Sequence, residues 1–128
     1  MKQKKIRVLM IAPGKEPDIV TLDNNLDALQ KAVSIGAPSQ GLIEIINLDA
    51  KTCLLCNEEG KLIGLTANRR LGYDIIVGVF YVCGQSKDGE LCSLSEKAIR
   101  FWSHVFAEPE YFENDEVEKA LSTGFTIL

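Results

Sequence analysis

The sequence DIIVGVFYVCG at residues 74–84 is a nearly continuous run of apolar side chains. A β-strand with this pattern is covered on both faces, so we expect it to be a central strand of a sheet. Gly78 in its middle indicates a bulge or the close approach of another backbone. Just before it lies CNEEGKLIGLTANRRL (Cys56–Leu71), the densest group of polar residues between apolar runs, around which we expect the chain to be organised.

Apolar runs bounded by turn residues predict further strands on either side of these two segments. The predicted strands that precede them are Ile6–Ala12, Asp18–Leu22, Leu42–Leu48 and Thr52–Asn57. Within the polar segment, Lys61–Leu65 is either a return strand or an extended loop, and Thr66–Tyr73 is a loop with one helical turn. Leu91 and Cys92 are expected to pair back on the central strand.

Two segments show helical periodicity. Leu26, Leu29 and Val33 share one face of a helix expected from about Asn24 to Ser34, with Asp23 or Asn24 as its cap. The stronger helix, Glu96–Ala107, is capped by Ser93 or Ser95 and ends before Pro109. Its broad apolar stripe contains Ala98, Ile99, Phe101, Trp102, Val105 and Phe106. Its polar face carries Lys97, Arg100 and His104.

Hairpins outnumber crossovers in this element order, which favours an α+β fold. We expect a mostly antiparallel sheet of about five to six strands, with the two main helices packed on one of its faces. The length of 128 residues fits a single domain, residues 1–128. An acidic appendix from about residue 108 to 128 follows the core, and in it Asp115–Leu121 is a candidate helix and Phe125–Leu128 a candidate short strand.

Composition excludes several functional classes. The net charge of −4 and the pI near 5.0 disfavour a general nucleic-acid binder, because neutralising phosphates requires a basic surface. No apolar segment approaches the roughly 18 residues that a membrane span requires. We therefore expect a cytoplasmic protein without a membrane partner, whose four cysteines are thiols.

No strong catalytic, metal or cofactor motif is present. Cys53-x-x-Cys56 has the spacing of half a zinc site, but in a strand the two side chains point to opposite faces, which favours packing roles. His104 is the only histidine and lies on the polar side of its helix, without a positioned partner. Glycine-rich phosphate loops are absent. We expect no catalytic residue, no bound metal, no cofactor and no enzymatic activity.

The sequence offers one candidate binding site, in the Asn68-Arg69-Arg70 segment. Arginine forks bind carboxylates and phosphates through paired hydrogen bonds. Asn57 and Asn68 can each donate and accept, as recognition of a base or amide edge requires. We therefore expect Asn57, Asn68, Arg69 and Arg70 to line a pocket for an anion. The alternative is that one arginine pairs with a nearby glutamate while the other is solvated.

The segment Cys56–Leu71, followed by YDIIVGVF at residues 73–80, resembles the family called domain of unknown function 3846. Members carry a similar CNEEGKL, then NR, then DIIxGxF. The opening VLMIAPGK and the closing SLSEKAIRFW are also similar, so the resemblance spans about residues 6–106. The family is typical of phages, plasmids and other mobile elements.

The resemblance implies a small accessory protein of a mobile element, acting in the bacterial host cytoplasm. Our leading hypothesis is non-enzymatic binding of a small anionic, nucleotide-like ligand at the four residues above, which would sequester a host defence signal. The alternative is an interaction module that inhibits a host defence protein of the anti-restriction type. Self-association into a homo-oligomer is a further expectation.

Overall fold

The structure is a computed structural model that describes residues 2–113 and 126–127. Its elements in chain order are β1 (Lys5–Ile11), β2 (Asp18–Asp23), α1 (Leu26–Val33), β3 (Ile43–Asp49), β4 (Thr52–Asn57), β5 (Ala67–Leu71), β6 (Asp74–Val77), β7 (Phe80–Gln85), β8 (Leu91–Cys92), α2 (Glu96–Val105) and β9 (Thr126–Ile127). Neither helix in these ranges has the length and apolarity needed to cross a membrane.

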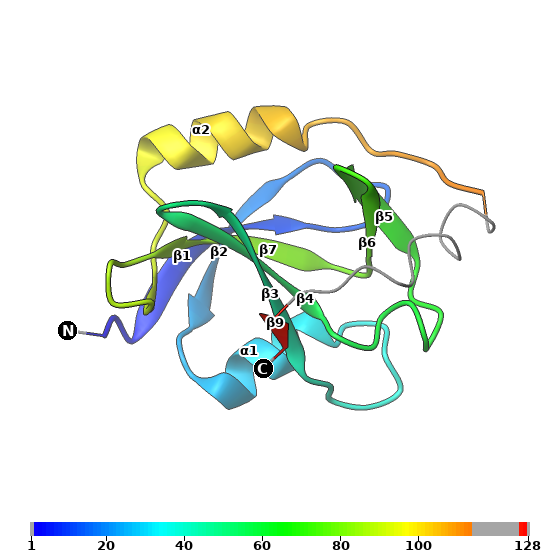
Figure 1. Ribbon diagram of the computed structural model, residues 1–128, viewed down its shortest axis with the longest axis horizontal. Coiled ribbons are helices and arrows are strands. Elements are labelled where there is room, and N and C mark those ends of the chain that lie inside the picture. Colours follow the sequence, from blue (N-terminus) through cyan, green and yellow to red (C-terminus); the bar gives the residue numbers. More distant parts are fainter. Residues whose placement is uncertain (1, 114–125, 128) are drawn as a thin grey trace.

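The main sheet follows the order β2-β1-β7-β4-β3-β9, with β8 pairing beside β7, and a separate hairpin joins β5 to β6 (Figure 1). Every strand pair in the described residues is antiparallel. This confirms the α+β class and the antiparallel sheet. The short strand expected within residues 125–128 is present as β9, whereas the candidate helix Asp115–Leu121 lies outside the described residues.

The two helices cover opposite faces of the sheet, so the expectation that they share one face is wrong (Figure 1). In β4, Cys53 and Leu55 face α1, whereas Leu54 and Cys56 face α2. The reason lies in the inner strands: all six residues of β4 are buried, and five of the six in β7. Strands that are apolar on both faces require a cover on each side.

Each helix begins at a side-chain cap. The Asn25 side chain accepts a hydrogen bond from the Ala28 N–H at 2.8 Å, so the cap of α1 follows the predicted Asp23 and Asn24. Asn24 is instead buried and donates to the carbonyl of Gln3 at 2.8 Å. Ser95 caps α2, as one of the two predicted candidates, by accepting from the Ala98 N–H at 3.1 Å.

The apolar run at residues 74–84 is two strands rather than one. β7 is central as predicted, between β1 and β4, but β6 turns away to pair with β5. The break falls at Gly78, whose φ is +73°. A Cβ at Gly78 would lie 2.8 Å from Cδ1 of Leu65, so a side chain approaches this position closely.

The interpretation of Thr66–Tyr73 as a loop is also wrong, because most of it forms β5. β5 is joined to β6 through a tight turn that contains Gly72, with φ at +59°. The two adjacent arginines before this turn interrupt the apolar pattern from which a strand is predicted, since charged side chains suggest exposure. Lys61–Gly64 forms turns, so the return-strand option for this stretch does not hold.

Comparison of Gly78→Ala with Gly14→Ala separates the stability cost of backbone strain from the cost of crowding. Both glycines have a φ of +73°, but nothing lies within 4 Å of a Cβ at Gly14. We expect Gly14→Ala to lower the free energy of unfolding by about 1 kcal/mol from backbone strain. Gly78→Ala should cost roughly 1–3 kcal/mol more, because the new methyl group collides with Leu65. Urea unfolding measures both losses, and equal losses would show that Leu65 moves aside freely.

Candidate functional site

Arg69 is a buried hub rather than an exposed anion binder. It is 0% exposed, the largest of the fully buried side chains. Its Nε donates to the Phe106 carbonyl at 3.2 Å, and its Nη2 donates to the Lys15 carbonyl at 2.5 Å. The remaining nitrogen, Nη1, donates to Oδ1 of Asn68 at 2.8 Å. The guanidinium therefore joins β5 to the β1–β2 turn and to the C-terminal end of α2.

Asn68 completes this hub and is also 0% exposed. Its Nδ2 donates to the carbonyls of Ile11 and Gly78, at 2.8 Å each. Those carbonyls lie at the end of β1 and at the bend between β6 and β7. Consecutive residues of a strand normally point to opposite faces, but the β5–β6 register shifts between Ala67 and Arg69, and both side chains are enclosed.

The electrostatics of the hub are unusual, because the cation is held by neutral acceptors. In the described part of the chain, no carboxylate lies within ion-pair distance of Arg69. Burial lowers the pKa of Arg69 from its ordinary value, and the charge of Glu110 acts in the opposite direction. Phe106 is the C-cap of α2, so its carbonyl belongs to the negative end of the helix dipole.

Arg70 has a different environment, with 48% of its side chain exposed. Its backbone N–H donates to Oε2 of Glu110 at 2.9 Å, and its Nε lies 4.0 Å from the other oxygen of that carboxylate. The guanidinium also lies 5.1 Å from the centre of the Phe112 ring. Arg70 therefore holds the segment that follows α2, and the predicted glutamate pairing is found at this arginine.

Asn57 lies apart from the arginines, at the end of β4, and is 4% exposed. Its Oδ1 accepts from the Glu59 N–H at 2.9 Å, and its Nδ2 donates to Oγ of Ser34 at 3.4 Å. It lines a cavity of about 390 Å³ together with Ser39, Gln40 and other residues. The lining contains Glu59 but no lysine or arginine, so this cavity suits a neutral polar ligand better than an anion.

The structure therefore distributes the four predicted site residues over three places. Asn68 and Arg69 form the hub, Arg70 contacts Glu110, and Asn57 borders a separate cavity. The donors of the hub already bind protein carbonyls, and neither of its side chains reaches solvent. The sequence does not reveal the hub, because the backbone carbonyls that accept from Arg69 belong to Lys15 and Phe106, which are far from it along the chain.

The cysteines have the packing role that was predicted. Cys53 and Cys56 are buried on opposite faces of β4. Burial raises the pKa of Cys53 to about 12 and raises that of Cys83 well above its ordinary value. The Cys56 thiol donates to Oε1 of Glu44 at 3.5 Å, and burial raises the pKa of that carboxyl. No group of three or more potential metal ligands occurs in the part of the chain that the structure describes.

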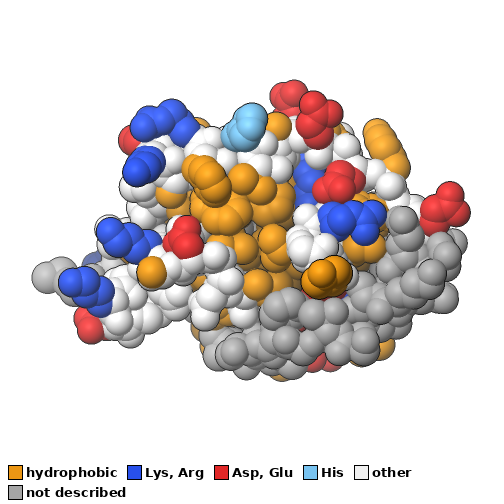
Figure 2. Space-filling view, turned by 45° about the horizontal axis from the view of Figure 1, so that its top comes forward, with side chains coloured by type: hydrophobic (Ala, Val, Ile, Leu, Met, Phe, Trp, Pro, Cys, Tyr) orange, Lys and Arg blue, Asp and Glu red, His pale blue; other side chains and the backbone are white. Residues whose placement is uncertain are grey.

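One surface escaped the sequence analysis, on the outer flank of α2. Phe101 is 58% exposed and Val105 47% exposed, and both belong to the broad apolar stripe predicted for this helix. Trp102 lies beside them, with its ring 5.0 Å from Phe101 and 5.8 Å from Phe106. We call Phe101, Trp102 and Val105 the α2 patch. Figure 2 shows hydrophobic side chains gathered on this side of the molecule, with both basic and acidic side chains around them.

Comparison with known proteins adds a family but no function. The family model described as "Domain of unknown function (DUF3846)" matches residues 6–107. No curated protein matches the chain, and no solved structure does.

Arg69→Met is expected to lower the free energy of unfolding by roughly 2–5 kcal/mol, because buried carbonyls lose their donors. Arg70→Met is the matched control, and we expect it to cost less than about 1 kcal/mol because the side chain is half exposed. Urea unfolding measures both. Arg69→Lys keeps the charge but offers fewer donors, so it should lose nearly as much as Arg69→Met. Equal stability of the Met variants at positions 69 and 70 would contradict the hub.

Proposed function

We propose that this chain, which belongs to the DUF3846 family, is a non-enzymatic protein that binds another protein through the α2 patch. The observation that carries this proposal is the exposure of Phe101 and Val105, at 58% and 47%, on the strongest helix of the chain. Aromatic side chains are enriched at the centres of protein interfaces, and Val105 lies one turn from Phe101 on the same flank.

The α2 patch is pre-formed, which favours binding. Trp102 stacks on Phe106 with an interplanar angle of 22°, and Phe106 meets Phe80 of β7 edge to face at 5.2 Å. This ladder of rings runs from the core to Trp102, and Phe101 packs edge to face on the Trp102 ring at 5.0 Å. Side chains that are already ordered lose less entropy when a partner covers them.

Charge indicates what kind of partner fits. Lys97 and Arg100 are exposed on the same helix, whose one carboxylate, Glu96, pairs with Arg7, in a chain whose net charge is −4. A complementary surface would place an apolar centre against Phe101 and Val105, with carboxylates at its rim. We infer that the partner presents an amphipathic, acidic surface.

The setting of this interaction is part of the proposal. The resemblance to proteins of phages and plasmids implies a host defence protein as the partner, in the bacterial cytoplasm. All four cysteines are free thiols, which supports a reducing compartment. Binding without chemical conversion is favoured because the groups whose pKa is most perturbed, such as Cys53 and Cys83, are enclosed in the core.

Small-ligand binding remains a second candidate, supported by the cavity beside Asn57. Its volume of about 390 Å³ lies within the usual range for ligand sites. Amide and hydroxyl groups of Gln40, Ser39 and Asn57 could read a base edge. The absence of a cation in the lining argues for a ligand whose charged part stays in solvent.

The double variant Phe101→Ser with Val105→Ser tests the proposed interface. Covering the exposed half of each side chain is worth roughly 0.8–1.5 kcal/mol, so the loss of both should weaken binding about tenfold. The matched control is Leu26→Ser, because Leu26 is 57% exposed on the other helix. Affinity capture from host lysate should recover a specific protein with the wild type and the control but not with the double variant.

Light scattering of the purified protein distinguishes a second copy of this chain from a foreign partner. Urea unfolding verifies that both variants are folded. If the double variant captured the same protein with the same affinity, the α2 patch would be excluded as the binding surface.

Calorimetry tests the second candidate with cyclic di- and mononucleotides and ADP-ribose derivatives. If a ligand enters the Asn57 cavity, Gln40→Ala should weaken its binding about three- to tenfold through a lost hydrogen bond. Arg70→Ala should leave the affinity unchanged. If Arg70→Ala weakened binding and Gln40→Ala did not, the ligand would bind near Arg70 instead. If no compound in the panel bound, the nucleotide hypothesis would be wrong.

A further inference from the structure

β2 forms one edge of the main sheet. Among the described strands it pairs with β1 alone, through a six-residue segment with the sequence DIVTLD (Asp18–Asp23). A strand in this position presents a row of unpaired backbone N–H and C=O groups, which is a template for pairing with another strand. β9, at the other end of the sheet, has two residues and offers a much shorter edge.

The hydrogen bonds to β1 determine which backbone groups of β2 point outward. The Asn24 N–H donates to the Lys4 carbonyl at 2.8 Å, so the next pair along the ladder, which contains Asp23, exchanges no hydrogen bonds. Because such pairs alternate, Ile19 and Thr21 have the same orientation as Asp23. The N–H and C=O groups of these three residues face away from β1, and none of these backbone groups has a hydrogen-bond partner in the part of the chain that the structure describes.

The opposite side of β1 supports this assignment. Arg7 stands opposite Thr21 in the ladder. The Arg7 N–H donates to Oγ of Ser93 at 2.9 Å, and the Arg7 carbonyl accepts from the Leu94 N–H at 2.9 Å. Both backbone groups of Arg7 are therefore used on the side away from β2, as in a pair without mutual hydrogen bonds.

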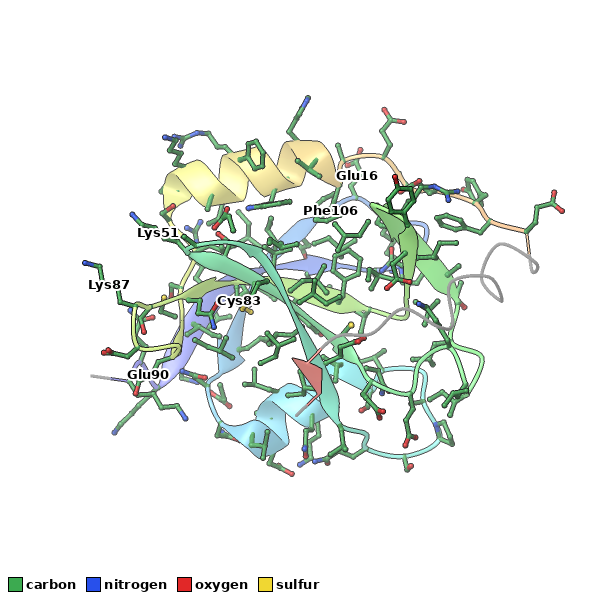
Figure 3. All side chains as sticks on the ribbon, viewed as in Figure 1. Glu16, Lys51, Cys83, Lys87, Glu90 and Phe106 are labelled. Carbon is green, nitrogen blue, oxygen red and sulfur yellow. The ribbon has the colours of Figure 1, made fainter. Side chains whose placement is uncertain are left out.

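The edge strand is held in place at both ends. The Lys15 carbonyl, in the turn before β2, accepts from Arg69. Figure 3 shows Glu16 of the same turn close to Phe106, whose carbonyl binds the same guanidinium. After β2, the buried side chain of Asn24 donates to two backbone carbonyls, at 2.8 and 3.2 Å. A row of groups that is already ordered loses little conformational entropy when a second strand pairs with it.

The middle of β2 lacks the features that protect most sheet edges. Natural sheets blunt an exposed edge with lysine, proline or a bulge. Pro17 lies outside the strand, the register with β1 is regular, and the two charged residues, Asp18 and Asp23, stand at the ends. The four residues between them are uncharged, and Ile19 is 44% exposed. The sequence of β2 therefore permits pairing with a further strand.

The alternation of backbone groups limits how a second copy of β2 can pair with this edge. Two residues stand opposite each other in an antiparallel ladder only if both direct their backbone groups toward that ladder or both direct them away. The groups of Asp18 face β1 and those of Asp23 face outward. The register that would set these two like charges against each other is therefore excluded.

One register uses every outward group of the edge. When Thr21 stands opposite Thr21 of the second copy, Ile19 stands opposite Asp23, and each of these pairs exchanges hydrogen bonds. Val20 then lies beside Leu22 of the second copy. Both of these side chains are partly buried against the core on the α1 side, so the pairing extends that apolar layer across the contact.

We propose that two copies of this chain associate through β2 in this register, which makes one continuous sheet across a two-fold axis. A shift by two residues would set Pro17, which has no N–H, or Asn25, which caps α1, against the edge. Pairing of identical edges is closed, and the short β9 leaves little edge for further growth, so a dimer forms instead of a fibre. The inference does not rest on the α2 patch, whose residues belong to another element.

Sedimentation velocity and amide hydrogen exchange of the full chain test the proposal. We expect a monomer–dimer equilibrium between about 10 μM and 1 mM, the range of modest affinities. As the concentration rises, the amides of Ile19, Thr21 and Asp23 should exchange more slowly, whereas those of Val20 and Leu22, already bonded to β1, should change little. A dimer without this alternation overturns the proposal. So does a monomer throughout the range, which would leave only a foreign strand as an occupant of the edge.

Charge at the centre of the pairing tests the register. Thr21→Lys sets two ammonium groups against each other, so it should weaken dimerisation at least about tenfold. Thr21→Glu should do the same, and an equimolar mixture of the two variants should dimerise more tightly than either alone, because unlike charges then meet. The matched control, Thr66→Lys, makes the same change at an exposed threonine outside β2 and should stay within about twofold. Urea unfolding verifies that each variant is folded.

The variants also separate this contact from the α2 patch. Phe101→Ser with Val105→Ser should keep the dimer, so the two proposals can fail independently. If that double variant were monomeric while Thr21→Lys still dimerised, self-association would belong to the α2 patch and the β2 pairing would be wrong. Equal weakening by Thr21→Lys and Thr66→Lys would also overturn it, since net charge alone would then control association. A mixture that dimerises no better than its separate components would overturn the register.

Discussion

The guanidinium of Arg69 is the contact on which the arrangement of the other elements depends. It binds the carbonyls of Lys15 and Phe106 and the side chain of Asn68, which in turn binds Ile11 and Gly78. Desolvating a cation costs several kcal/mol, and here the cost is offset by hydrogen bonds to backbone oxygens that would otherwise be buried without donors. One side chain thereby supplies hydrogen-bond donors to a carbonyl in the turn after β1 and to a carbonyl at the end of α2.

The hub also explains why a short chain can cover both faces of its sheet. The core is divided into two clusters, one containing Leu54 and Phe106 and the other Leu55 and Val33. The helices have eight and ten residues, so each is short for covering a face of the sheet. On the α2 side the β5–β6 hairpin adds Ile76 to the cover, and its position depends on Arg69 and Asn68.

The sequence predicts those parts of the fold in which burial follows a local pattern. The central strand β7, the buried β4, the opposite placement of Cys53 and Cys56 and both helices follow from period and composition. β5 does not, because Arg69 is buried through acceptors 37 and 54 residues away, and no window of sequence contains them. The candidate site failed to assemble for the same reason: arginine next to asparagine suggests an anion pocket only while their internal partners are unknown.

The proposed α2 patch depends on residues that do not touch it. The flank of α2 carries Phe101 and Val105, and the carbonyl of its C-cap residue, Phe106, accepts from Arg69. The helix is held at one end by the contacts of Ser93 and Leu94 with Arg7, and at the other end by the guanidinium. Its position over the sheet is therefore fixed by hydrogen bonds at its ends as well as by apolar packing between them. A change in the hub would shift the proposed α2 patch on the same helix, so Asn68 and Arg69 would influence binding there without contacting the partner.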